Sequence, residues 1–335
     1  MIKNTFLGLG PMSLEVIDSL NFFSKKHKKK LMLICSRNQI ECKKLGGGYV
    51  NNFSTETFSS YIKAKKNEFL IMCRDHGGPF KKDGSNKSLK NEIENSKLSY
   101  ENDIKHDFKI IHIDTSACGK MKYEIATELV NFCEKIAKKY KKKINFEFGC
   151  EEHGVLTNFK KFNEDVKFFS KIKNRQYIVC QTGSLVKSIF QVGQFDIDTV
   201  KKMKKIVNKH GILLKEHNGD YLNRQQIQLR RHYGIDAINI APELGVIQSN
   251  LIYNLGKKFS FDKEVNNFVK ATLAKGKWKK WLYSKENNLI KFFSSGHYCF
   301  TLNEYQNLKY KISKKTNFQT LLNKDIENNL LKYYK

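Results

Sequence analysis

The sequence of 335 residues contains no run of about 18 apolar residues, so it predicts no transmembrane helix. Its first 20 residues lack the long apolar stretch and the small-residue cleavage site of a secretory signal. Its eight cysteines include no C-x-x-C pair, and several end apolar runs, where a reduced thiol serves as a small buried hydrophobic group. We therefore expect a cytoplasmic protein that does not contact a membrane.

Acidic residues are scarce beside basic ones, with 33 Asp and Glu against 61 Lys and Arg and a formal net charge of +28. A charge of this size suggests nucleic-acid binding. Arginine, which makes most of the forked contacts with phosphates and bases, is nevertheless rare among the basic residues. The lysines are spread along the chain together with many asparagines, as an AT-rich coding bias produces. The sequence therefore predicts a solvated lysine surface and no nucleic-acid partner.

Eight short apolar runs recur along the chain, most of them separated by a stretch with helical spacing. Runs rich in Ile, Leu, Val and Phe are typical of parallel strands that are buried on both faces. Eight such strands close a (β/α)8 barrel, so an α/β TIM barrel is the predicted fold. The predicted strands are Asn4–Gly10, Leu31–Ser36, Phe69–Arg74, Lys109–Asp114, Ile144–Gly149, Tyr177–Thr182, Ile212–His217 and Ala237–Pro242. The predicted helices are Leu14–Phe23, Thr55–Lys65, Tyr123–Tyr140, Val166–Lys171, Asp198–Lys209, Arg224–His232 and Leu244–Leu255.

Two regions lie outside this simple repeat. The long polar segment Lys81–Asp107 is predicted to be an excursion that carries the third helix. From Phe259 onward the chain is helical and aromatic, which predicts a barrel over residues 1–258 and a C-terminal helical extension, packed on it, over 259–335. An open doubly wound sheet is the alternative, but the segment Gly8–Ser13 lacks the third glycine of a dinucleotide-binding fingerprint.

Polar side chains follow seven of the eight predicted strands. In a barrel such residues project at the C-terminal mouth, where active sites of this fold are assembled. A capped structural histidine also explains the one strand that ends in Asp75 and His76. Seven such strand ends favour a mouth that binds a polar ligand. The residues concerned are Ser36–Gln39, Arg74–His76, Asp114–Ser116, Glu147, Gln181–Thr182, His217–Asp220, and Asn239 with Glu243.

Histidines and carboxylates at these positions suggest a metal site. We expect His76 and His217 to be neutral imidazole ligands of a divalent cation, with zinc as the candidate. Glu147 or Glu152 is the expected oxygen ligand. Asp75 lies next to His76 and is the expected proton carrier on the substrate.

Further site residues are predicted around these groups. Asp114 and Glu152 are the other candidate catalytic carboxylates. Segment 146–154 holds three carboxylates and a histidine, which favours a raised pKa or a bound cation, with a solvated loop as the alternative. Barrels often hold a phosphate on backbone N–H groups after strands seven and eight, so one is expected near 217–220 and 239–245. The predicted substrate-binding residues are Ser36, Asn38, Gln39, Gln181, Gly219, Asp220 and Asn239.

Several motifs also occur in the order of a known family. Segment 36–50 resembles a Ser-x-Asn-Gln element followed by Gly-Gly-Tyr, and 74–79 is similar to Asp-His-x-Gly-Pro. Segment 112–116 is similar to His-x-Asp-x-Ser, 217–221 to His-x-x-Asp-Tyr, and 241–244 to Gly-Pro-Ala-Leu. With the aromatic tail, these motifs resemble the non-catalytic subunit of class II tagatose-bisphosphate aldolase, a relative of class II fructose-bisphosphate aldolases. The match runs through most of the chain.

The resemblance implies a metal-dependent aldolase barrel that acts on a ketose phosphate or a related sugar. It implies that Asp75 is the proton donor and that His76 and His217 are metal ligands. Catalytic relatives carry a further histidine after the sixth strand, where this sequence has Gln181 and Thr182. A three-histidine zinc site cannot be assembled from these positions. Either a carboxylate or water completes the site, or the metal is lost.

Two functions therefore stay open. The first is a carbon–carbon lyase of carbohydrate metabolism built around Asp75, His76, Glu147 and His217. The second is a non-catalytic subunit that stabilises a separate catalytic aldolase, as the resembled family implies, and a homo-oligomer is a further possible assembly. The Asp75–His76 pair, the acidic segment and the second histidine favour the first function.

The first prediction concerns the charge. If the lysines reflect a compositional bias, the purified protein should show no tight, salt-sensitive affinity for duplex DNA or RNA. Fluorescence anisotropy with labelled duplexes over a range of salt concentrations measures this. Sub-micromolar binding at physiological salt, with a steep salt dependence, would contradict the prediction.

Overall fold

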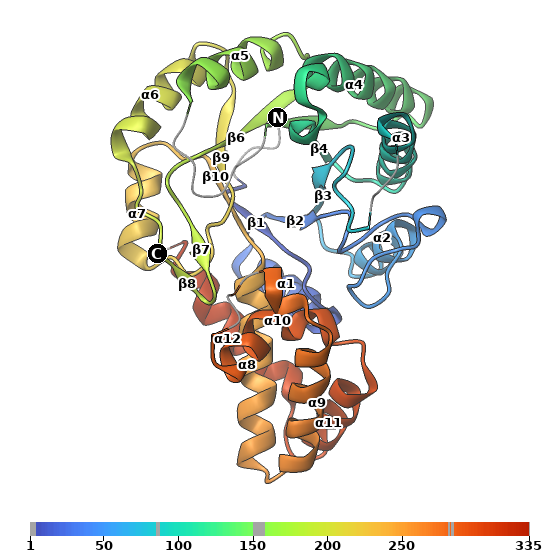
Figure 1. The fold of residues 1–335 in the computed structure, drawn as a ribbon, viewed down its shortest axis with the longest axis vertical. Helices are drawn as coiled ribbons and strands as arrows, with labels where there is room; N and C mark the ends of the chain where they lie inside the picture. Colours follow the sequence, from blue (N-terminus) through green and yellow to red (C-terminus); the bar gives the residue numbers. More distant parts are fainter. Residues whose placement is uncertain (1–4, 85–87, 150–157, 281, 283–284, 335) are drawn as a thin grey trace.

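A closed barrel of eight parallel strands forms the centre of the protein (Figure 1). The computed structural model describes residues 5–84, 88–149, 158–280, 282 and 285–334. Around the barrel the strands follow the order β1-β10-β9-β6-β5-β4-β3-β2. Each predicted apolar run overlaps one of these strands, so the predicted TIM barrel is confirmed. Strand β3 continues past the predicted end to Gly77, and β6 begins two residues before the predicted start. The strands are β1 (Leu7–Leu9), β2 (Leu31–Cys35), β3 (Leu70–Gly77), β4 (Ile110–Ile113), β5 (Asn145–Phe148), β6 (Arg175–Cys180), β9 (Leu213–Glu216) and β10 (Ala237–Ile240).

A helix follows each barrel strand, and most of these helices begin at a polar capping residue. Side chains such as those of Ser13, Ser54 and Asn223 accept a hydrogen bond from a backbone N–H group of the first turn. The third helix lies within Lys81–Asp107, as predicted. The helices are α1 (Leu14–His27), α2 (Thr55–Ala64), α3 (Leu89–Lys105), α4 (Lys122–Lys139), α5 (Phe159–Phe169), α6 (Ile197–Asn208), α7 (Arg224–His232) and α8 (Pro242–Lys258).

Two local predictions were wrong. Helix α5 begins at Phe159, seven residues before the predicted start at Val166, because Asn158 caps it and Phe162 adds a buried turn. The sequence also did not predict a small antiparallel hairpin, β7 (Val186–Lys187) and β8 (Phe190–Gln191), after β6. Strands of two residues are too short to show a period-two pattern.

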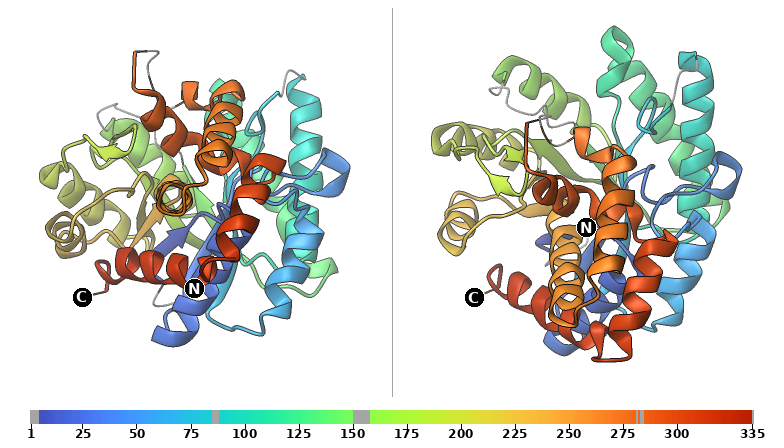
Figure 2. Two further views of the ribbon diagram at one scale, coloured as in Figure 1. Left: turned by 90° about the horizontal axis from the view of Figure 1, so that it is seen from below. Right: turned by 60° about the horizontal axis from the view of Figure 1, so that its bottom comes forward.

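The C-terminal part of the chain is helical, as predicted. Figure 2 shows the last helix, in red, beside α1, in blue, and the two helices are in contact. Ser19 of α1 donates a hydrogen bond of 2.8 Å to Asn323 of α12. The division of the chain at residue 258 stays a prediction. The elements are α9 (Asp262–Ala274), the 3-10 helix η3 (Lys277–Lys280), α10 (Asn288–Ser295), the 3-10 helix η4 (Gly296–Cys299), α11 (Asn303–Ser313) and α12 (Phe318–Leu331).

Among the described residues, no helix combines the length and the apolar character needed to cross a membrane. The seven cysteines of the described part are all buried and free. Their place in the core agrees with the predicted role of reduced thiols as small hydrophobic groups.

Strand β3 shows how the barrel sorts its side chains. Successive residues of a strand face opposite sides of the sheet. Met72 belongs to the large apolar core between sheet and helices, whereas Cys73 belongs to a small apolar cluster inside the barrel. The same alternation turns Arg74 outward to the helices and Asp75 inward to the mouth. The end of β3 therefore contributes one residue to the contacts with the helices and one to the mouth of the barrel.

Arg74 is buried between β3 and the helices, where its guanidinium donates four hydrogen bonds. Nε and Nη2 donate to the two carboxylate oxygens of Asp103 in α3, at 2.7 and 2.6 Å. Nη1 donates to the carbonyl oxygens of Cys35 and Ile40, at 2.9 and 2.7 Å. Arg74 thus fastens α3 to β2 and β3.

The second prediction concerns this buried ion pair. Asp103→Ala should destabilise the fold by about 3–5 kcal/mol, because it leaves the buried Arg74 guanidinium without the carboxylate to which it is hydrogen-bonded. Lys97→Met is the control, because the pairs of Lys97 with Glu94 and Glu128 are exposed and should contribute little. Urea unfolding measures both changes. Equal effects of the two substitutions would contradict the prediction.

Candidate active site

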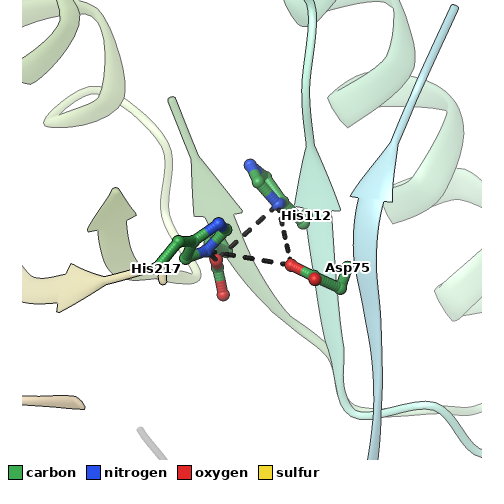
Figure 3. Close-up of side chains that lie close together, drawn as sticks. Asp75, His112 and His217 are labelled. Carbon is green, nitrogen blue, oxygen red and sulfur yellow. Dashed lines mark hydrogen bonds and ion pairs between the residues drawn. The ribbon is translucent and has the colours of Figure 1, made fainter. Parts of the chain in front are cut away.

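Four potential ligand atoms converge at the C-terminal mouth of the barrel. They belong to Asp75 at the end of β3, His112 of β4, Glu147 of β5 and His217 just after β9, and all four side chains are buried. These atoms lie within 4.8 Å of one another. Figure 3 shows Asp75, His112 and His217 pointing toward a common centre.

The closest approach within the cluster joins His217 and Glu147. His217 Nε2 lies 3.0 Å from Glu147 Oε1 and 3.8 Å from Asp75 Oδ1. His112 Nδ1 lies 3.6 Å from each of the same two oxygen atoms. Two imidazole nitrogens and two carboxylate oxygens form a donor set that suits zinc or manganese.

Hydrogen bonds fix the ring of His112. Its Nε2 lies 2.7 Å from the carbonyl oxygen of Gly149, which can only accept, so Nε2 carries the proton. Nδ1 is then unprotonated in the neutral ring and accepts a hydrogen bond of 3.2 Å from the backbone N–H of His76. Nδ1 is also the ring nitrogen on the side of the cluster, 3.6 Å from Asp75 Oδ1 and from Glu147 Oε1. Sequence analysis did not select His112 as a ligand, because it lies inside a strand rather than at its end.

Lys215 supplies a positive charge beneath the cluster. Its Nζ lies 2.6 Å from Glu147 Oε2, and both side chains are 1% exposed. Although burial opposes charge on both groups, Lys215 holds the pKa of Glu147 at about 2, and Glu147 keeps the pKa of Lys215 raised. Lys215 was also missed. The signal available was its spacing of two from His217, which places both residues on one face of the strand.

His76 lies beside the cluster and has its own carboxylate partner. Its Nδ1 is 3.0 Å from Asp114 Oδ2, its Nε2 is 4.0 Å from Asp75 Oδ2, and its ring centroid is 5.0 Å from that of His217. Burial opposes protonation of His76, but Asp75 and Asp114 outweigh it and raise its pKa to about 9. Lys81 also pairs with Asp114, at 2.9 Å. The expected role of His76 as a ligand stays a prediction, because its atoms are not among the four that converge.

A cavity of about 570 Å³ opens above the cluster. Asp75, His76 and His217 line it, so these three side chains face both the cluster and the cavity. Five of the seven predicted substrate-binding residues also line it, namely Ser36, Asn38, Gln39, Asp220 and Asn239. Gln181 and Gly219 are not lining residues. Glu152 lies outside the residues that the structure describes.

The far wall of the cavity comes from the C-terminal extension. Lys275, Lys277, Lys280, His297 and Tyr298 line it, opposite the strand ends. None of these residues was predicted. The prediction took the site from strand ends and βα loops alone, and the extension follows the last strand in sequence.

The start of α8 does not offer the phosphate site that the sequence predicted. Asp220 Oδ1 accepts the backbone N–H groups of Ala241 and Glu243, at 3.0 and 2.8 Å. A carboxylate already occupies the place that a phosphate would take. Burial and the neighbouring Glu243 raise the pKa of Asp220 to about 7.

Comparison with known proteins gave matches in structure only. The search against family models and the search of curated proteins found no match. A probable tagatose 6 phosphate kinase from Sinorhizobium meliloti 1021 aligns with a TM-score of 0.82 and 14% identity, over 98% of this chain and 99% of its own. Fructose-bisphosphate aldolase from Campylobacter jejuni aligns with a TM-score of 0.57 and 13% identity, over 98% and 90%. The fructuronate-tagaturonate epimerase UxaE from Cohnella laeviribosi aligns with a TM-score of 0.59 and 10% identity, over 98% and 81%. At these identities the likeness shows a shared barrel fold.

The third prediction concerns Asp220. Asp220→Asn keeps an oxygen acceptor for the two N–H groups of α8 and removes the ionisable carboxyl. Because the pKa of Asp220 is raised to about 7 in the folded state, its contribution to stability is full below about pH 4 and is lost as the pH rises through 7.

The wild type should therefore lose about 2 kcal/mol of unfolding free energy relative to Asp220→Asn between pH 5.5 and pH 8. Urea unfolding of both proteins at the two pH values measures the difference. If the unfolding free energies of the wild type and of Asp220→Asn changed equally between the two pH values, the raised pKa of Asp220 would be contradicted.

Proposed function

We propose that this chain is a class II aldolase-like enzyme of carbohydrate metabolism, which makes or breaks a carbon–carbon bond of a ketose phosphate or a related sugar. The observation that carries the proposal is the convergence of Asp75, His112, Glu147 and His217 beneath the cavity at the barrel mouth. The motif order of the sequence and the barrel fold shared with an aldolase and an epimerase agree with it. The buried free cysteines suit a cytoplasmic protein.

His112, Glu147 and His217 are the residues that would hold a divalent cation, with zinc as the first candidate. When bound, such an ion withdraws electrons from a substrate carbonyl or hydroxyl oxygen. The ionised Glu147 can provide a donor atom without loss of a proton. This set does not need the histidine after the sixth strand that the sequence lacks.

Asp75 is the proposed proton carrier. It lines the cavity, and its Oδ1 accepts a hydrogen bond of 3.4 Å from Asn239. A carboxylate in this position can take a proton from a substrate hydroxyl, or return one to carbon, while the other three residues hold the cation. Asp114 positions His76 beside it. A catalytic role for Glu152 is part of the proposal and rests on the sequence.

The alternative function is a non-catalytic subunit that supports a separate aldolase or assembles with copies of itself. One observation favours it. Lys215 already neutralises Glu147, and the backbone N–H of His76 already occupies Nδ1 of His112. The cluster thus has internal partners for two of its donors. Metal analysis of the purified protein, followed by turnover assays on phosphorylated and free ketoses, separates the two functions.

The fourth prediction separates cation binding from proton transfer. His217→Ala should weaken binding of zinc or manganese at least tenfold, because it removes a donor. Asp75→Asn should retain the cation within a few-fold and lower kcat by about 10²–10⁴-fold, because a proton carrier acts on the substrate. Calorimetry with the metal ion alone measures the first effect, and steady-state kinetics measures the second.

His210→Ala is the matched control, because His210 precedes β9 at the opposite end of the barrel from His217. It should change neither quantity. Loss of the cation in Asp75→Asn as large as in His217→Ala would make Asp75 a ligand instead of a proton carrier. A protein that binds no divalent ion would support the alternative function.

A further inference from the structure

The cavity above the cluster has two chemically different ends. Asp75, His76 and His217 line its floor. Its outer wall is basic, because four lysines line it there and Asp83 is the carboxylate among them. The lysines are Lys82 from the loop after β3, and Lys275, Lys277 and Lys280 from the extension. Four ammonium groups against one carboxylate leave an excess of positive charge.

The contacts of these lysines leave room for an anion. Lys277 and Lys280 share Asp83, with Nζ at 3.1 and 2.7 Å from its Oδ2. Lys82 donates to backbone carbonyl oxygens, one of them Gly47 O at 3.0 Å. The backbone N–H of Lys275 caps α9, but its ammonium group forms no hydrogen bond or ion pair with the described residues. The ammonium group is therefore available to a ligand at the edge of the cavity.

His297 forms a neutral part of this wall. It is 2% exposed and lines the cavity, while its Nδ1 is enclosed and has no hydrogen-bond partner among the described residues. Gly245 of α8 leaves room for the imidazole, because a Cβ atom at that position would lie 3.1 Å from Nδ1. Burial lowers the pKa of His297 to about 3, so the ring is neutral. The ring lies beside that of Tyr298, with centroids 4.1 Å apart and planes tilted by 39°. The two residues thus add a ring surface next to the lysines.

The usual place for a phosphate in this fold is closed. The carboxylate of Asp220 accepts hydrogen bonds from the backbone N–H groups at the start of α8, and Glu243 adds a second carboxylate beside it. An anion placed there would meet like charge. The basic end of the cavity lies instead between the extension and the loops after β2 and β3.

We propose that the lysine wall formed by Lys82, Lys275, Lys277 and Lys280 binds the phosphate group of the substrate. His297 and Tyr298 then contact the sugar between this phosphate and the cluster. A phosphate dianion matches the excess of positive charge better than a single carboxylate does. The C-terminal extension thereby completes the site and selects phosphorylated sugars. This inference rests on the proposed function, because it concerns the other end of the same cavity.

The test measures binding and not turnover. Calorimetry or ³¹P NMR with inorganic phosphate and with fructose 6-phosphate should show binding to the wild type. Lys275→Met should lower the affinity for each of the two ligands at least fivefold, and adding Lys82→Met should lower both affinities further. Lys279→Met is the matched control: it removes the same charge from the nearby 3-10 helix η3, but Lys279 does not line the cavity. It should bind as the wild type does.

Failure of this inference and failure of the proposed function can be told apart. His217→Ala should still bind both phosphate probes, whatever happens to the metal and to turnover. The proposed phosphate site would be overturned if the wild type did not bind phosphate. It would also be overturned if Lys275→Met and Lys279→Met weakened phosphate binding equally. Tighter binding of D-glucuronate than of fructose 6-phosphate, with the same dependence on Lys275, would overturn the assignment to phosphate in favour of a sugar acid.

Discussion

The barrel can bury the ionised Glu147 because Lys215 lies beside it. An isolated carboxylate in such surroundings would take up a proton rather than stay charged. Lys215 holds one oxygen of Glu147 at 2.6 Å, which leaves the other oxygen turned toward His217 and His112. The pair therefore fixes the orientation of the acidic group around which the two histidines and Asp75 gather. Contacts within the chain thus hold these side chains in place.

A buried charge also needs a partner on the outer face of the sheet, where Arg74 lies. Arg74 and Asp75 are neighbours in sequence, but the pleat of the strand sends them to opposite faces. Arg74 pairs with Asp103 and supports the helical layer, whereas Asp75 stays available at the mouth. One strand end thus contributes to stability and to the site without competition between the two.

The extension after α8 is part of the site as well as of the fold. Its lysines reach Asp83 across the cavity, and its last residues are tied to the loop after β9 through the bond from Tyr333 to the carbonyl of Gly219, at 3.0 Å. Ligand selection can therefore lie in a segment that the barrel itself does not require. A strand-end carboxylate, Asp220, instead caps α8 and serves the fold.

The sequence by itself determined the barrel, the order of its strands and the face on which polar residues gather, because apolar periodicity and strand-end chemistry are local properties. It also placed Asp75, Glu147 and His217 at the mouth. Only the tertiary structure decided which side chains meet. His112 and Lys215 lie within strands rather than at strand ends, and their approach to Glu147 depends on how the strands close into the barrel. Lys275 and His297 join the cavity through the packing of distant helices. The closure of the barrel and the register of its strands bring these residues together. Neither can be predicted from the local pattern of the sequence.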